Sequence, residues 1–239
     1  MPLPKIATPT YELVLPSTKK TIKYRPFLVK EEKLLVLALE SEDTKEITTA
    51  IKAVIGNCIS TRGIKVDKLP TFDIEYLFLN IRGKSVGEEV DVNIVAPDDG
   101  DTLIPVKISL DDIKVIESED HNKHIKLDDT LMMEMKYPSL DQFIKNNFDF
   151  NGNTGIDQSF ELIAGCIDKI YSEDEVWAAD DCSKKEITEF LEQMNSLQFK
   201  DIEKFFETMP KLSHTVEVTN PETKVKSTVV LEGLSSFFA

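Results

Sequence analysis

The side chains best placed for metal chemistry lie in a polar segment, DFNGNTGIDQSF, which runs from Asp149 to Phe160. Carboxylate and amide oxygens at close, regular spacing are typical of calcium-binding loops. Such a loop also needs glycine at its sixth position and a bidentate glutamate at its twelfth, and these positions hold Thr154 and Phe160. The sequence therefore favours a polar loop between two helices over a calcium site.

The three histidines are a second source of chemistry. His121 and His124 lie three residues apart beside Glu119 and Asp120, but a zinc site would need further ligands that the spacing does not identify. We therefore expect solvated loop histidines at these two positions. His214 stands alone, and neither a GxSxG turn nor a glycine-rich phosphate loop occurs. A metal-dependent or hydrolytic enzyme, with a site assembled from dispersed carboxylates and histidines, remains the alternative hypothesis for function.

The charge of the chain limits its partners. The 43 acidic and 28 basic residues give a net charge of −15, which repels phosphate backbones, so we expect no binding to nucleic acid. Acidic residues gather in segments 111–119, 128–134 and 172–181, where they are typical of a solvated surface. Docking of a basic peptide on such a surface is the alternative interpretation.

The cysteines and the apolar runs indicate a compartment. Cys58, Cys166 and Cys182 form no CxxC pair and cannot all pair with one another, which favours a reducing cytosol over a disulfide framework. The N-terminus lacks the continuous apolar region of a signal peptide, and no stretch reaches the roughly 18 apolar residues that span a bilayer. We therefore expect no export by a signal peptide and no membrane insertion.

Two groups of large apolar side chains are candidate partner contacts. Trp177 lies in the acidic segment YSEDEVWAADDCS, where it either anchors a loop on the core or contacts another protein. Near the C-terminus, Leu234, Phe237 and Phe238 recur at helical spacing and should pack onto another surface. That surface belongs either to the second half of this chain or to a neighbouring subunit.

The elements that would position these residues begin with a predicted hairpin. Residues 10–15 and 21–29 have strand composition on either side of a turn-prone segment. The run Leu34–Leu39 is apolar on all sides, which predicts a central helix that other elements cover on several faces. Asp43 begins a second helix in a capping-box pattern, and Pro70 opens a third helix, whose wide apolar surface predicts a position between layers.

Strands and helices also alternate further along the chain. Alternating apolar residues predict hairpins over 90–110 and 216–231, and segment 125–136 resembles a strand. Helical spacing of apolar residues predicts four further helices, over residues 139–148, 156–170, 183–194 and 199–209.

Together these segments predict an α+β fold that is mostly helical, with two or three β-hairpins. Because a helix precedes a hairpin in each half, two related helix-plus-hairpin lobes are one interpretation, and convergence of common hairpin patterns is the other. Pro138 and an Asn-Gly-rich stretch break the pattern near the middle of the chain. We therefore expect domains at residues 1–136 and 137–239.

Two apolar segments with fixed polar flanks resemble a known family. They are RPFLVKEEKLL, which begins at Arg25, and LPTFDIEYLFL, which begins at Leu69 and is followed by Arg82–Glu88. In this order they resemble the baseplate hub and hub-assembly proteins of T-even-type contractile-tailed phages (myoviruses), well over the first half of the chain and loosely beyond it. The resemblance implies a structural or chaperone-like assembly subunit of the baseplate hub that acts by protein–protein contacts.

The resemblance also implies partners and a location. The partners would be other phage baseplate or hub proteins, and a homo-oligomer is a further option. The protein would act in the host cytoplasm during tail assembly, with retention in the baseplate of the virion left open. The family offers no catalytic residues, so the resemblance implies no enzymatic activity, no cofactor and no metal site. We expect Arg25–Glu88 to form interior scaffolding.

Overall fold

The computed structural model describes residues 6–41, 43–140, 142, 156–233 and 236, and it divides into two compact units. Unit 1 comprises Met1–Ile116 and Lys211–Ala239, and unit 2 is the intervening segment Glu117–Pro210. Unit 2 is therefore an insertion into unit 1. The chain passes from unit 1 to unit 2 after Ile116 and returns after Pro210, rather than dividing once at the expected boundary after residue 136. Each unit has its own apolar core.

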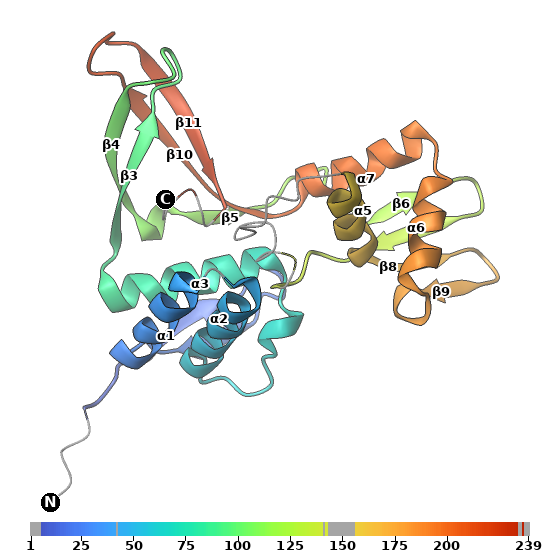
Figure 1. Cartoon of the computed structure of the whole chain (residues 1–239), viewed down its shortest axis with the longest axis horizontal. Helices are drawn as coiled ribbons and strands as arrows, with labels where there is room; N and C mark the ends of the chain where they lie inside the picture. The colour runs from blue at the N-terminus through green and yellow to red at the C-terminus, as the bar shows by residue number, and fades with distance from the viewer. Residues whose placement is uncertain (1–5, 42, 141, 143–155, 234–235, 237–239) are drawn as a thin grey trace, which may run out of the picture. The chain divides into compact units, whose positions relative to one another are not determined.

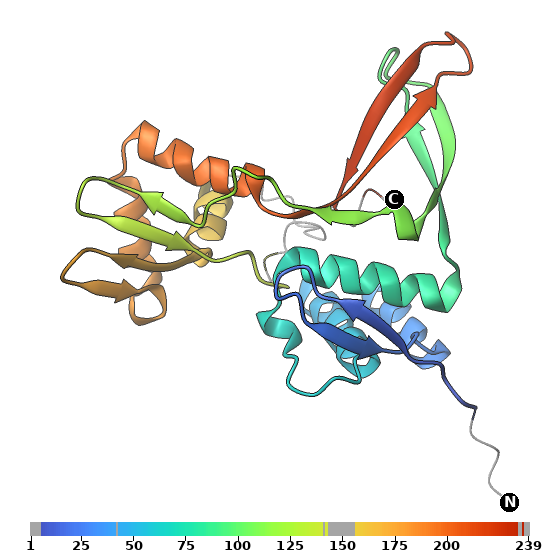
Figure 2. The same ribbon diagram turned by 180° about the vertical axis from the view of Figure 1, so that it is seen from behind.

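Unit 1 begins with a hairpin followed by three α-helices. The elements are β1 (Tyr11–Val14), β2 (Thr21–Tyr24), α1 (Val29–Glu40), α2 (Thr44–Cys58), the 3-10 helix η1 (Val66–Lys68) and α3 (Thr71–Val86). Asp43 caps α2 by accepting the backbone N–H groups of Lys45 and Glu46, as the sequence predicts. Figures 1 and 2 view the chain from opposite sides and show the β1–β2 hairpin first behind, then in front of, α1 and α2.

Helix α3 is the most deeply buried helix of unit 1. Ile74 and Leu77 are almost inaccessible, and the charged Asp73 is fully buried as well. Ser17, in the turn between β1 and β2, donates its backbone N–H to Asp73 Oδ1 at 3.0 Å and its hydroxyl to the same carboxylate, which ties the hairpin to the start of α3. The helix contacts α2 and also two later strands, β5 and β10. The predicted position between layers is confirmed.

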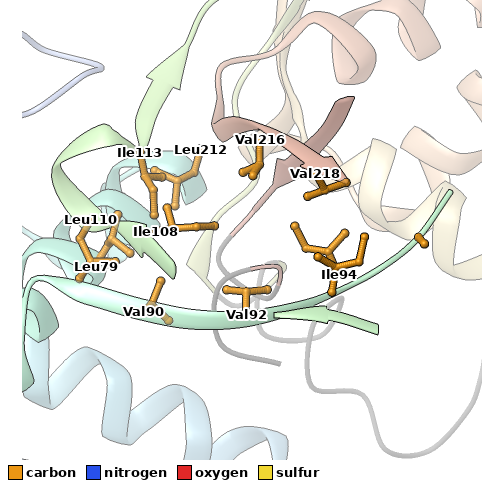
Figure 3. Packing of buried hydrophobic residues seen from close by; sticks show 12 residues of the cluster. Leu79, Val90, Val92, Ile94, Ile108, Leu110, Ile113, Leu212, Val216 and Val218 are labelled. Carbon is orange, nitrogen blue, oxygen red and sulfur yellow. The ribbon is translucent and has the colours of Figure 1, made fainter. Parts of the chain in front are cut away.

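Two antiparallel sheets complete unit 1. One pairs β3 (Glu89–Val95) with β4 (Leu103–Ser109), and the other has the order β11 (Lys226–Glu232), β10 (Lys211–Thr219), β5 (Lys114–Ile116), with the 3-10 helix η2 (Leu110–Asp112) before β5. Both predicted hairpins, over 90–110 and 216–231, are confirmed. Figure 3 shows Val92 and Ile94 of β3 facing Val216 and Val218 of β10 across a shared core.

Hydrogen bonds also join the turns of these two hairpins. Asn220, which is only 1% exposed, donates its side-chain N–H groups to Asp98 at 3.1 Å and to Asp99 at 2.8 Å. The Thr223 hydroxyl donates to Asp98 as well. Because an isolated two-stranded hairpin is marginally stable in water, the shared core and this polar network are what hold the hairpins together.

Unit 2 is a four-stranded antiparallel sheet with helices packed on one face. The strand order is β6 (His124–Lys126), β7 (Met132–Met135), β8 (Ile167–Tyr171), β9 (Val176–Ala178), and the other elements are α5 (Ile156–Gly165), η3 (Ala179–Asp181), α6 (Lys184–Glu192) and α7 (Ser196–Thr208). Met133 and Ile167 from the sheet share a core with Leu191 and Phe205 from the helices. The predicted capping box at Ser183 and Glu186 is present at the start of α6.

The prediction of a mostly helical chain is wrong. Of the described residues, 40% lie in helices and 27% in strands, which is an ordinary mixed α+β composition. One reason is segment 156–170, which the sequence predicts as one helix. The helix ends at Gly165, and Ile167 and Ile170 belong to strand β8. A run such as IDKIY satisfies a strand as well as a helix, because it is too short for its apolar period to decide.

The interpretation of two helix-plus-hairpin lobes also fails. It assigns one hairpin to each half of the chain, whereas the β3–β4 and β10–β11 hairpins lie in the same unit and share one core. Helix α7, which precedes the second hairpin in sequence, belongs to unit 2. The order helix then hairpin therefore does not mark a repeated structural unit.

Candidate interaction surface

The histidines do not converge on a common site. His121 Nδ1 lies 3.0 Å from the Thr208 hydroxyl, and its Nε2 lies 3.1 Å from the hydroxyl of Tyr137. The His124 ring instead lies 3.2 Å from the Tyr171 hydroxyl. Among the residues that the structure describes, no three His, Cys, Asp or Glu side chains are grouped so that they could hold a metal ion. The predicted helix over 139–148 and the calcium-like segment from Asp149 lie mostly outside the described residues.

His121 lies in a loop of unit 2 but is half-buried and packs against aromatic side chains, so the expectation of a solvated loop histidine is wrong there. Its ring lies 5.2 Å from that of Phe205 and 5.6 Å from that of Tyr137, measured between centroids. The Thr208 hydroxyl donates to the carbonyl of Lys204, so it accepts from Nδ1–H of His121. Because burial lowers the pKa of His121, the imidazole is neutral at neutral pH, and its Nε2 then accepts from the Tyr137 hydroxyl.

A pH dependence of stability follows from this packing. Burial lowers the pKa of His121, so the unfolded chain, with a pKa near 6.5, takes up a proton before the folded chain does. The contribution of His121 to stability is therefore complete above about pH 6.5 and is lost as the pH falls through the folded-state pKa. We expect urea denaturation to show a smaller loss of stability between neutral and mildly acidic pH in His121→Gln than in the wild type. Equal losses in both proteins would contradict this role.

The two buried cysteines are not nucleophiles in this fold. Burial raises the pKa of Cys58 to about 11 and that of Cys166 to about 12. Both thiols are completely inaccessible, so they remain protonated and pack as small apolar side chains. The prediction that Cys58 is a core thiol is confirmed.

The candidate contact residues named from the sequence are only partly visible. Trp177 lies in the edge strand β9, opposite Ile170 of β8, and 42% of it is exposed. Leu234, Phe237 and Phe238 lie outside the described residues. A role of these four residues in partner contact stays a prediction.

The largest departure from the sequence-based expectation is the exposure of helix α1. The run predicted to be covered on several sides lies at the surface, and only Glu31 and Ala38 of this helix are buried. We use the name α1 surface for its exposed apolar residues, which are Val29 (79% exposed), Leu34 (39%), Val36 (49%), Leu37 (53%) and Leu39 (47%). Scattered exposed apolar residues are ordinary, but five on one helix form a patch that is typical of a protein contact.

A groove beside α1 extends this patch. It has a volume of about 410 Å³ and runs between α1 and α2. Leu34 and Leu37 line it from α1, and the small side chains of Thr49, Ala50 and Ala53 line it from α2. Lys45 and Glu46 add two charged side chains to the α2 wall, but the depression at the surface of unit 1 is largely apolar.

The family-like segment that begins at Arg25 anchors α1 rather than forming a site. The carboxylate of Glu31, with its side chain 2% exposed, accepts Arg25 Nη2 at 2.9 Å and the backbone N–H of Leu28 at 2.8 Å. Burial alone opposes ionisation of Glu31, but these hydrogen bonds outweigh it and hold the pKa of Glu31 below its ordinary value. Glu31 therefore remains charged inside the protein and fixes the start of the helix.

Backbone contacts of the same segment lock α1 onto its neighbours. The N–H of Arg25 donates to the carbonyl of Cys58, at the end of α2, at 2.9 Å. The N–H of Phe27 donates to the hydroxyl of Ser85, in α3, at 2.9 Å. The expectation that Arg25–Glu88 is interior scaffolding is thus correct for the start of α1 and for α3, and wrong for the outer face of α1.

Charge at four positions of α1 is the signal that points to this exposure. Lys30, Glu32 and Lys33 precede the apolar run Leu34–Leu39, and Glu40 follows it. A helix enclosed on several sides would have to bury some of these charges, which is costly without a partner. The leucine content of the run outweighed this signal in the sequence-based prediction.

Comparison with known proteins identifies the family. The family model described as T4 bacteriophage base plate protein matches residues 8–239. No curated protein and no solved structure matches the chain. Within the described residues, no helix has the length and apolar character needed to cross a membrane. The matched region includes both segments that carried the resemblance and nearly all of the sequence, so the chain belongs to the T4 bacteriophage base plate protein family.

Proposed function

We propose that this protein is a structural or chaperone-like assembly subunit of the phage baseplate hub and that it acts by contacts with other baseplate proteins. The family match places the chain among baseplate proteins. The observation that supports a contact role most directly is the α1 surface, an apolar patch held in place by the ion pair between the half-buried Arg25 and the buried Glu31. Its work would begin in the host cytoplasm, where tails are assembled.

The choice of a contact role over catalysis rests on the positions of the reactive groups. In the part of the chain that the structure describes, His121 is engaged by Thr208 and Tyr137, and the thiols of Cys58 and Cys166 are buried. The exposed apolar area of the α1 surface, in contrast, is not covered by the described residues of α1 and α2. A subunit that joins other proteins accounts for both features, whereas a hydrolytic site would account for neither.

The proposal predicts that charge on the α1 surface blocks assembly. We expect the Leu34→Glu/Leu37→Glu double variant to weaken the contact by at least about 2 kcal/mol, or about 30-fold in affinity, because buried leucine contacts would be replaced by unpaired carboxylates. Phage that carry this variant should yield few complete tails, while the soluble protein accumulates normally. Counting infectious particles and separating baseplates from smaller intermediates by sedimentation measures both quantities.

A matched control is available in the other unit. Leu197 is a helical leucine in α7 with 77% exposure, so Leu197→Glu adds a charge to an exposed helix outside the α1 surface. It should leave assembly unchanged. Normal tail yield from the double variant would overturn the proposed contact role of α1.

Mass spectrometry of purified tails distinguishes a hub component that is retained in the tail from an assembly factor that leaves it. A retained component is found in the purified tails, whereas an assembly factor is absent from them.

A further inference from the structure

The charged side chains on the outward face of α1 are ordered so that the face is complementary to an antiparallel copy of itself. At 100° per residue, Val29, Lys33, Val36 and Glu40 follow one another at intervals of four, three and four residues along one stripe. This stripe lies on the side of the helix opposite the buried Glu31 and Ala38. It therefore presents, in chain order, an apolar, a basic, an apolar and an acidic side chain.

Lys33 and Glu40 make this face different at its two ends, basic toward the start of α1 and acidic at its end. Both side chains are exposed, and neither forms an ion pair with another described residue. They lie seven residues apart, with Val36 and Leu37 at the midpoint between them. A second helix that covers this face should therefore carry an acidic side chain opposite Lys33 and a basic one opposite Glu40.

We propose that a second copy of this chain covers the α1 surface, with the two α1 helices antiparallel about a two-fold axis between Val36 and Leu37. In that register Lys33 lies opposite Glu40 of the partner subunit, and Glu40 opposite Lys33 of the partner subunit. Val36 lies opposite Leu37 of the partner subunit across the axis, and Leu37 opposite Val36 of the partner subunit. A two-fold interface uses the same patch on both copies, so it must be self-complementary, and this stripe meets that requirement.

A parallel arrangement of the two helices would not satisfy the charges. It would bring Lys33 close to Lys33 of the partner subunit and Glu40 close to Glu40 of the partner subunit, which is unfavourable in both places. The antiparallel arrangement is thus selected by charge, while burial of apolar side chains supplies the attraction.

The contact should be modest in strength. A helix of 12 residues is only about 18 Å long, so the face is small beside a standard interface. The net charge of −15 on each copy adds a long-range repulsion that salt screens. Association is therefore best measured at physiological ionic strength, over protein concentrations from about 1 µM to about 1 mM.

Sedimentation equilibrium of the full chain with charge-reversal variants tests the proposal. Lys33→Glu and Glu40→Lys should each weaken the dimer at least about tenfold, because each substitution makes both symmetry-related charge pairs repulsive. The double variant Lys33→Glu/Glu40→Lys should restore the wild-type dissociation constant to within about threefold. An equimolar mixture of the two single variants should form a mixed dimer, because each then carries the charges that the other lacks.

Lys33 and Glu40 are both exposed, so circular dichroism should show unchanged folding in all variants. A wild-type chain that stays monomeric over the whole concentration range overturns the proposal, and so does a dimer that single reversals leave intact. Neither result contradicts the hub function, which is tested separately by tail yield in the leucine variants. A monomer that still assembles tails would leave a different baseplate protein as the occupant of α1.

Discussion

Phe205→Ala is expected to lower the free energy of unfolding of unit 2 by about 3–5 kcal/mol. Phe205 is 1% exposed, and its ring packs against those of His121, Tyr137 and Phe206 with centroid separations of 5.1–5.9 Å. Truncation to alanine removes most of this packing and leaves a cavity that a helix wedged against a sheet cannot fill by collapse.

Amide hydrogen exchange of the full chain measures the effect and its location. Because each unit has its own core, we expect the loss of protection in Phe205→Ala to be confined to residues 117–210. Leu197→Ala is the control, since Leu197 lies in the same helix and is 77% exposed, and it should change stability by less than about 0.5 kcal/mol. An equal loss of protection in both units would show that the insertion does not unfold independently.

Arg25→Met should have the second largest effect, a loss of about 3 kcal/mol in the stability of unit 1. The substitution keeps much of the aliphatic packing of Arg25 but removes the charge that faces Glu31. Glu31 is 2% exposed, and among the described residues it keeps the N–H of Leu28 and the exposed Lys30 as its partners. Breaking a buried ion pair by removing one member is costly because the other charge stays buried.

An exposed pair of the same type is the control for this prediction. Lys23 lies 3.3 Å from Glu12, and both side chains are more than half exposed. Lys23→Met should therefore change stability by less than about 1 kcal/mol in urea denaturation. If Arg25→Met were as mild as Lys23→Met, the view that this pair anchors α1 would have to be abandoned.

The sequence predicts local structure well wherever the apolar residues recur with a single period. Residues 90–110 alternate cleanly around the turn Pro97–Gly100, and the hairpin forms with the register that this alternation requires. Caps at Asp43 and Ser183 mark the starts of α2 and α6 correctly, because their side chains satisfy free backbone N–H groups. Such features depend on neighbours in sequence, which a single sequence contains.

Features that depend on distant contacts could not be predicted in the same way. Strand β8 forms because it pairs with β7, and β9 because it pairs with β8. Without these partners, the sequence IDKIY fits the end of a helix equally well. The insertion of unit 2 depends on the pairing of Lys211 with Ile116, which are 95 residues apart in sequence (211 − 116). No local pattern near either residue marks that pairing.

The candidate site was missed for a related reason. Leucine-rich composition indicates that α1 needs a cover, but it does not indicate whether that cover belongs to this chain or to another. The structure shows Leu37 at 53% exposure, so the cover is not supplied by the described residues of this chain. The family, in contrast, was predictable from the two segments that begin at Arg25 and Leu69, and the family match over residues 8–239 confirms it.

We propose that another protein chain covers the α1 surface during baseplate assembly. Site-specific photo-crosslinking in infected cells can detect that chain, with the crosslinking residue placed at Leu37 and, as the control, at Leu197. We expect position 37 to form a crosslink to an identified baseplate protein or to a second copy of this chain, and position 197 to form none. An absence of crosslinks from position 37 in cells that assemble normal tails would contradict it.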